Sequence, residues 1–206
     1  MSNGYDFTVH FTPEATRKNI SSIIERFGIP NNIVEIGCYE GSTTFWMAEQ
    51  IGSINNNLKI FAIDPHNDSI DILESLEVAH KRFIHNINAC PVKCVHYIRK
   101  KSNQGLIDLI NHDIKCEFIY IDGDHTAGSV LTDLVLAWEL LVPGGVILCD
   151  DATQWQFTNH TNGEISSQMS PRMAIESFIQ CNWHKITPLW IPDGMQTAFI
   201  KKIPTK

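Results

Sequence analysis

FIYIDGDH, at residues 118–125, decides the fold of this chain together with VILCDD, at residues 146–151. Each stretch is an apolar run of strand length that ends abruptly in acidic residues. Between them, the apolar periodicity from Val130 to Leu141 predicts a helix, which Pro143-Gly144-Gly145 closes. A strand, a helix and a strand in this order predict parallel neighbours whose acidic ends share one edge of a sheet. Open α/β sheets bind ligands at that edge, so we expect the chemistry there.

The composition is that of a globular protein with one domain spanning residues 1–206. Its 43% hydrophobic and 19% charged residues are typical of a folded chain. The net charge of −7 argues against a partner that is nucleic acid. No apolar run reaches membrane-spanning length and the N-terminus lacks a signal-peptide pattern, so we expect a cytoplasmic protein without a membrane partner.

The six cysteines are expected to be thiols in a reducing compartment. Four of them lie in or beside apolar segments and are predicted to be buried: Cys38, Cys116, Cys149 and Cys181. Cys90 and Cys94, with His85 and His96 nearby, raise the alternative of a structural zinc site. Their spacing fits no common zinc module and residues 92–98 read as a strand, so zinc is not favoured.

Helices and strands alternate along the chain. Periodicity and capping signals predict helices at residues 13–27, 42–51, 71–87, 104–111, 130–141 and 171–180. Strands are predicted at 33–36, 59–63, 92–98, 116–121 and 146–149, and a terminal hairpin at 184–191 and 197–201. We therefore expect an N-terminal helical segment (1–30), a core (31–151), and a substrate loop, helix and hairpin (152–206). Together they predict a doubly wound α/β sheet with an antiparallel addition.

A glycine-rich turn follows the first predicted strand. Glu35, Gly37 and Gly41 precede a helix that begins at Ser42 or Thr43. Glycines allow a backbone to approach a ligand closely, although tight packing alone also explains them. The Gly-x-x-x-Gly spacing differs from that of dinucleotide-binding folds, and Glu35 would repel a pyrophosphate and attract a cation or an amine.

With Glu-x-Gly-x-x-x-Gly followed by Asp64, the chain resembles the class I S-adenosylmethionine-dependent methyltransferases. IDGDH at 121–125, with PGG at 143–145 and DD at 150–151, makes it similar to the macrocin and mycinamicin type of sugar O-methyltransferases, relatives of the catechol and caffeoyl-CoA enzymes. The resemblance covers residues 33–151. It implies a Rossmann-like seven-stranded sheet with the order 3-2-1-4-5-7-6 and strand 7 antiparallel.

The resemblance also implies the roles of individual residues. His125 takes the position of the general base, and Asp122 serves catalysis, cofactor and metal. Asp64 takes that of the acceptor for the ribose hydroxyls. The cofactor-binding residues are Glu35, Gly37, Gly41, Ser42, Asp64, Asp122 and Asp124. The metal ligands are Asp122, Asp150 and Asp151.

The chemistry of these residue types agrees with those roles. Crowded carboxylates raise one another's pKa unless a cation lies among them, and oxygen ligands favour Mg²⁺. A histidine can remove a hydroxyl proton near neutral pH. There are alternatives for each residue: Asp150 and Asp151 can cap a turn, Asp124 can cap the following helix, and His125 can be a surface residue beginning that helix.

The sequence therefore predicts a methyltransferase that uses S-adenosylmethionine and Mg²⁺ to methylate a hydroxyl of a small molecule, of sugar or phenolic type. The alternatives are a metal-independent methyltransferase acting on another nucleophile, a cofactor-binding protein without turnover, and a metal-dependent hydrolase. Acceptor specificity is predicted to lie in residues 152–170, with Trp190, Asp193 and Met195 as a facing wall. Association into a homo-oligomer is left open.

Overall fold

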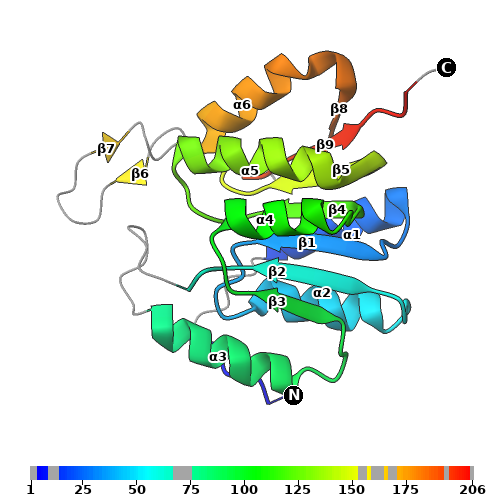
Figure 1. Ribbon diagram of the computed structural model, residues 1–206. Helices are drawn as coiled ribbons and strands as arrows, with labels where there is room; N and C mark the ends of the chain where they lie inside the picture. Colours follow the sequence, from blue (N-terminus) through cyan, green and yellow to red (C-terminus); the bar gives the residue numbers. More distant parts are fainter. Residues whose placement is uncertain are drawn as a thin grey trace.

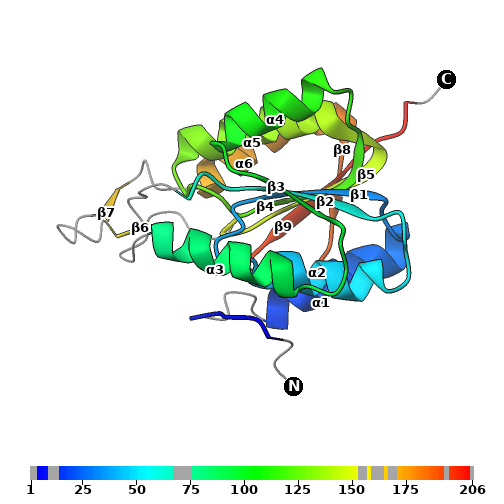
Figure 2. The ribbon, with the colours of Figure 1, turned by 60° about the horizontal axis from the view of Figure 1, so that its bottom comes forward.

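The computed structural model describes residues 4–8, 14–66, 76–152, 157–158, 165–166, 171–192 and 195–204. Its centre is a seven-stranded sheet with the order β3-β2-β1-β4-β5-β9-β8, in which β9 runs antiparallel to β5 and the strands from β3 to β5 are parallel. Helices α4, α5 and α6 cover one face and α1, α2 and α3 the other (Figures 1 and 2). The predicted fold class and strand order are confirmed.

The helices and strands alternate as predicted. The helices are α1 (Glu14–Phe27), α2 (Ser42–Gly52), α3 (Leu76–Ala89), α4 (Ser102–Asn111), α5 (Ala127–Leu140) and α6 (Pro171–Cys181), with a 3₁₀ turn at Trp183–Lys185. The strands of the sheet are β1 (Asn32–Ile36), β2 (Lys59–Ile63), β3 (Val95–Ile98), β4 (Cys116–Ile121), β5 (Leu141–Cys149), β8 (Ile186–Leu189) and β9 (Thr197–Lys201). A separate antiparallel pair is formed by β6 (Phe157–Thr158) and β7 (Ile165–Ser166).

Several boundaries differ from the sequence prediction, among them the start of β3 at Val95 and of α4 at Ser102, and two of the differences have local reasons. Helix α5 begins at Ala127 because the Thr126 side chain accepts a hydrogen bond from the N–H of Ser129, which caps the helix. The segment Pro143-Gly144-Gly145 lies within β5 instead of forming a separate turn. The β4–β5 pairing is irregular between Cys116 and Phe118, which lets β5 begin at Leu141.

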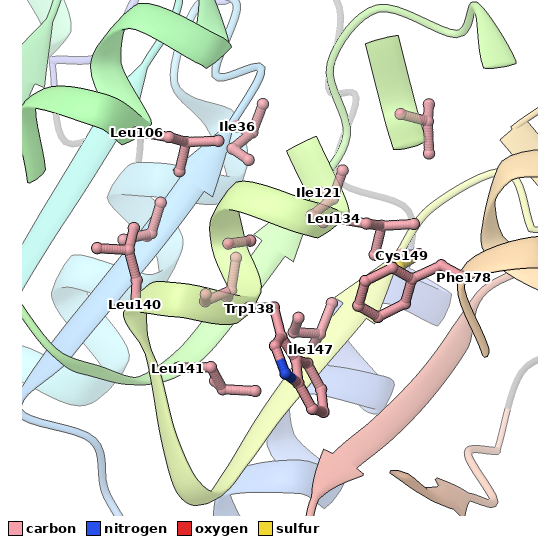
Figure 3. Packing of buried hydrophobic residues seen from close by; sticks show 14 of the residues in the cluster. Ile36, Leu106, Ile121, Leu134, Trp138, Leu140, Leu141, Ile147, Cys149 and Phe178 are labelled. Carbon is pink, nitrogen blue, oxygen red and sulfur yellow. The ribbon is translucent and has the colours of Figure 1, made fainter. Parts of the chain in front are cut away.

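The four inner parallel strands, β2, β1, β4 and β5, are largely buried on both faces, which explains their nearly continuous apolar sequences. On the α4–α6 face, Trp138 and Phe178 meet edge to face with ring centroids 5.6 Å apart. Figure 3 shows both rings packed beside Ile147 of β5. On the other face, Phe45 and Phe83 pack over the residues of β1 and β2. The two packed faces hold the ends of the parallel strands in fixed positions.

The prediction of buried thiols is wrong for Cys181, which is exposed at the last residue of α6. Cys38, Cys116 and Cys149 are buried as predicted. Cys90 and Cys94 are also buried, in the apolar cluster beneath α2 and α3. Among the described residues, these two cysteines belong to no group with the geometry of a metal site.

No helix in the described part of the chain has the length and apolar character needed to cross a membrane.

Asp133 of α5 is a buried acid, and neither of its carboxyl oxygens has a hydrogen-bond partner within the described structure. Burial raises its pKa to about 7, against a smaller opposing effect of Ser102. Because the folded protein holds this proton more tightly than the unfolded chain, stability falls as the pH rises from about 4 toward 7. We expect Asp133→Asn to escape that loss. Its advantage in unfolding free energy over the wild type should therefore grow by on the order of 2 kcal/mol from pH 5 to pH 8. Urea unfolding at the two pH values measures it, and an equal difference at both would contradict the assignment.

Candidate active site

Four residues of the predicted site occupy one row at the carboxyl edge of the sheet. The strands end in register, because Ile36 of β1 pairs with Ile63 and with Ile121, and Ile121 pairs with Cys149. The next residue of each strand is therefore Gly37, Asp64, Asp122 or Asp150. Strand order reverses between β1 and β4, and open α/β sheets bind ligands at such a point.

Gly37 and Gly41 have conformations that glycine favours, with φ of 81° and 87°. A Cβ on Gly37 would lie 1.9 Å from the carbonyl oxygen of Asp122, so the turn after β1 packs directly against the end of β4. A Cβ on Gly41 would lie 2.1 Å from the ring of Phe45. Gly41 is the N-cap of α2, which begins at Ser42, and the N-terminus of this helix follows the carboxyl end of β1. The first glycine thus joins the predicted cofactor loop to the predicted metal site.

The carboxylate of Asp64 holds the glycine-rich turn in place. Its Oδ2 accepts the N–H groups of Cys38 and Tyr39 at 3.0 and 2.9 Å, and its Oδ1 accepts that of His66 at 2.8 Å. A carboxylate has about four acceptor positions, so these bonds leave capacity for a hydroxyl. The side chain is 14% exposed, which keeps it accessible from the edge.

Sequence analysis gave no role to His66 and Tyr97, which support the same turn from below. Nε2 of His66 lies 2.6 Å from the carbonyl oxygen of Tyr39, and Nδ1 lies 2.6 Å from the hydroxyl of Tyr97. Because a carbonyl only accepts, Nε2 donates to Tyr39, while the Tyr97 hydroxyl lies between Nδ1 and the carbonyl oxygen of Asp64, to which it donates at 3.3 Å. Cys38, Asp64 and His66 come close enough to hold a metal ion. Both His66 nitrogens already have partners, so these residues serve the shape of the turn.

Glu35 lies beneath the turn and is 1% exposed. Its carboxyl accepts a hydrogen bond of 2.5 Å from the hydroxyl of Thr44 in α2. Burial raises the pKa of Glu35 to about 8, with a smaller contribution from the charge of Asp64. In the described structure the Glu35 carboxyl contacts Thr44 of α2 and does not face the edge of the sheet. Glu35 therefore supports the turn from beneath and does not offer its carboxyl directly to a ligand amine.

Asp122 and Asp150 share the hydroxyl of Tyr120, a residue that sequence analysis treated only as part of a strand. The Tyr120 oxygen lies 2.9 Å from Oδ2 of Asp122 and in short hydrogen-bonding contact with Oδ2 of Asp150. Burial raises the pKa of both carboxyls; for Asp122 the charge of Asp150 adds to the effect. Burial also raises the pKa of Tyr120 well above its usual value, so the phenol stays protonated and serves as a donor.

Asp151 and His125 close the acidic cluster. Nε2 of His125 lies 2.9 Å from Oδ2 of Asp151, and the backbone of Asp151 has a φ of 50°. Asp122, His125 and Asp151 each offer a ligand atom, and these atoms lie within 4.8 Å of one another. The structure thus brings two of the predicted metal ligands, Asp122 and Asp151, together with the predicted base, while Asp150 lies outside that group and is turned toward Tyr120.

Asp124 braces the start of α5. Its carboxylate accepts hydrogen bonds from the N–H and hydroxyl of Thr126, at 3.0 and 3.2 Å, and from the hydroxyl of Ser129 at 2.7 Å. This is the helix-capping alternative that the sequence left open. A contact of Asp124 with a cofactor stays a prediction.

A small hollow of about 10 Å³, with room for a single water molecule, lies over these residues. Its polar border is formed by Asp122, Gly123, Asp124, His125 and Asp150, and its apolar border by Ile121, Val130, Cys149 and Pro171. Carboxylates and an imidazole therefore lie beside apolar residues around this hollow, which is smaller than a site for a whole small molecule.

The predicted substrate loop, 152–170, falls mostly outside the described residues; Ala152, β6 and β7 are described. The N–H of Ala152 donates to the carbonyl of Met195 at 2.8 Å, which ties the end of β5 to the terminal hairpin. Trp190 and Met195 are 75% and 50% exposed. Asp193 also lies outside the described residues. The facing wall therefore stays a prediction.

The cluster has the chemistry of a site for a hard cation. Asp122 and Asp150 are half-buried acids whose pKa values are raised by loss of solvent, and Asp151 lies near them. A divalent ion among them would relieve this cost, because it favours the charged form of each carboxyl. The residues present fit such an ion.

A doubly wound sheet with a glycine turn and acids along its carboxyl edge defines an α/β protein that binds a ligand at the switch point. A family model described as a methyltransferase domain matches residues 34–152. Because that range is more than half of the chain, the protein belongs to this methyltransferase family. No curated protein sequence matches the chain.

Several solved structures share the fold. An O-methyltransferase from Bacillus cereus in complex with SAH is 18% identical, with a TM-score of 0.67 over 94% of this chain and 84% of that one. A candidate caffeoyl-CoA O-methyltransferase from Staphylococcus aureus is 18% identical, with a TM-score of 0.63 over 88% and 80%. A candidate rRNA-methylase from Clostridium thermocellum is 15% identical, with a TM-score of 0.62 over 93% and 100%. At these identities the likeness establishes the fold, and the acceptor must be argued from the site.

Proposed function

We propose that this chain transfers the methyl group of S-adenosylmethionine to a hydroxyl of a small molecule, with a divalent cation, Mg²⁺, at the acidic cluster. The observation that carries the proposal is the row of Gly37, Asp64, Asp122 and Asp150 at the carboxyl edge of the sheet. It sets the turn of a methyltransferase domain beside an acidic cluster on the adjoining strands.

The methyl donor is proposed to lie along the turn between β1 and α2. Gly37 and Gly41 permit the backbone of this turn to approach the donor closely, and the N-terminus of α2 at Ser42 offers N–H groups. Asp64 would accept its ribose hydroxyls while keeping its bonds to the turn. Asp122 and Asp124 would border it on the side of the acceptor, and the buried Glu35 would support the turn from beneath through its contact with Thr44.

The cation is proposed to be held by Asp122, Asp150 and Asp151. Carboxylate oxygens are the ligands that Mg²⁺ prefers. When bound, such an ion supplies Lewis-acid activation of the acceptor hydroxyl by lowering its pKa. The protein's part is to keep three acids together at one strand edge, which their mutual repulsion would otherwise oppose.

His125 is proposed to take the hydroxyl proton at Nδ1, because Nε2 faces the Asp151 carboxylate at 2.9 Å and would donate to it. The Asp151 carboxylate would then stabilise the imidazolium. The lone pair of the acceptor oxygen attacks the methyl carbon while the carbon–sulfur bond breaks and its electrons go to the sulfur. The products are a methyl ether and S-adenosylhomocysteine. Positioning of the two reactants would supply much of the acceleration.

The acceptor is proposed to be a small hydroxyl compound of sugar or phenolic type. The net charge of −7 and the acidic edge disfavour a polyanionic acceptor such as RNA. Beside the acids, Ile121, Val130 and Pro171 form an apolar border against which the ring of a phenol or the carbon face of a sugar would pack. Membership of the macrocin and mycinamicin type stays a prediction.

A thermal-shift series followed by product analysis tests the proposal. S-adenosylmethionine and S-adenosylhomocysteine should each raise the melting temperature, because both bind the folded state. Mg²⁺ should raise it further, and a panel of sugars and phenols should give a methyl ether whose formation stops with a chelator. Cofactor stabilisation with chelator-resistant turnover would indicate the metal-independent enzyme. Cofactor stabilisation without turnover would indicate a binding protein, and stabilisation by metal alone a hydrolase.

A further inference from the structure

Among the described residues, the hydrogen-bond donors to the side chains of Asp122 and Asp150 are neutral groups, and the titratable His125 lies near Asp122 as well. Tyr120 lies between their Oδ2 atoms, Gln196 donates to Oδ2 of Asp150 at 3.0 Å, and the backbone N–H of Asp151 donates to Oδ1 of Asp150 at 2.8 Å. An arginine or lysine in these positions would cancel the negative charge of the carboxylates. Neutral donors fix the direction of the two acids and leave their charge for a cation.

The hold on Asp150 extends to the N-terminal helix. Gln196 is 6% exposed and donates also to the hydroxyl of Thr16 at 2.9 Å, while its own oxygen accepts from Asn19 at 2.8 Å. Thr16 and Asn19 belong to α1 and are themselves buried. Gln196 is therefore locked in one orientation, with an N–H aimed at Asp150. A satisfied buried network of this kind fixes the atoms it contains.

We propose that Tyr120, supported by Gln196, is a positioning residue that keeps Asp122 and Asp150 side by side for the cation, so that α1 contributes to the site without touching it. The inference rests on the metal part of the proposed function. Groups that hydrogen-bond to the ligands of a metal commonly change its affinity by about 10- to 100-fold when they are removed. Tyr120 serves two ligands at once, which places it among the groups with a large effect.

The test is the affinity for Mn²⁺, a spectroscopic substitute for Mg²⁺, measured by electron paramagnetic resonance beside the affinity for S-adenosylhomocysteine measured by calorimetry. Tyr120→Phe removes one oxygen and keeps the ring that packs in the core. We expect its Mn²⁺ affinity to fall by about 10- to 100-fold, with the affinity for S-adenosylhomocysteine within about threefold of wild type. Gln196→Met should weaken Mn²⁺ binding too. In the double variant that combines it with Tyr120→Phe, the two losses should add to less than their sum, because both residues act on one oxygen of Asp150.

Tyr5→Phe is the matched control, because it removes the same hydroxyl from a part-buried tyrosine that donates to Glu49 at 2.7 Å, away from the acidic cluster. It should leave Mn²⁺ affinity unchanged. Unchanged Mn²⁺ affinity in Tyr120→Phe overturns the inference, as does an equal loss in Tyr5→Phe. A wild-type protein that binds S-adenosylhomocysteine and no Mn²⁺ overturns it together with the metal part of the proposed function, while methyl transfer itself stands. If Tyr120→Phe does not fold, Gln196→Met carries the same comparison.

Discussion

Replacement of Gly37 by alanine should abolish binding of S-adenosylhomocysteine and destabilise the protein by more than about 4 kcal/mol, an effect at the extreme end for a single substitution. The added Cβ would lie 1.9 Å from the carbonyl oxygen of Asp122 and 2.6 Å from its carbonyl carbon. Both are backbone atoms of a central strand end, so neither can move without breaking the pairing of β1 with β4. The φ of 81° adds strain for any residue with a side chain.

Urea unfolding and calorimetric titration measure the two effects. Gly128→Ala is the matched control, since a Cβ there meets nothing within 4 Å and the residue lies in helix α5. That substitution should be neutral or should stabilise by up to about 1 kcal/mol, as expected for alanine in a helix. A Gly37→Ala protein as stable as wild type, with its ligand affinity intact, would show that β1 and β4 do not end against each other.

Asp122→Asn should remove Mn²⁺ binding and lower methyl transfer by more than about 100-fold, because a cation that polarises an acceptor is worth several kcal/mol. The same substitution should raise the stability of the protein without ligands. Burial and the charge of Asp150 hold the pKa of Asp122 above its ordinary value, so folding is penalised as the pH rises above the pKa of an unfolded aspartate. The stability gain should therefore be large at pH 8 and vanish in strong acid.

Melting curves from pH 3 to pH 8 and product formation at saturating donor check both parts. Asp108→Asn is the control, because it removes one carboxylate that is 41% exposed and paired with Lys100 on the surface. It should alter neither turnover nor the pH dependence of stability appreciably. An Asp122→Asn enzyme with wild-type turnover would exclude a role of this acid in the reaction.

The sequence predicted the layered fold well because its signals are local and repeated. Alternating apolar strands and helices, each with a turn residue at its end, specify parallel pairing with few alternatives. The acidic ends of β4 and β5 were predictable for the same reason, since parallel strands place their carboxyl ends on one edge. The misplaced start of β5 came from Pro143-Gly144-Gly145, which form an irregular segment between the paired residues Leu141 and Val146 and do not end the strand.

The sequence could not predict the contacts that depend on packing. Tyr120 alternates with apolar neighbours like any core residue, and only the register of β4 with β5 places its hydroxyl between two acids. Gln196 lies 46 residues from Asp150 in the chain, so no motif links them. The exposure of Cys181 depends likewise on where the last turn of α6 points. Such long-range hydrogen bonds leave no periodic signal.

The most direct test of the account is the paramagnetic effect of bound Mn²⁺ on the methyl carbon of ¹³C-labelled S-adenosylmethionine held by the enzyme. Adjacent strands are about 4.8 Å apart, so a donor on the turn of β1 and an ion at the ends of β4 and β5 should lie within about two strand spacings. The account predicts strong relaxation of the methyl signal, lost in Asp122→Asn. A methyl signal that Mn²⁺ leaves unchanged, with both ligands bound, would contradict it.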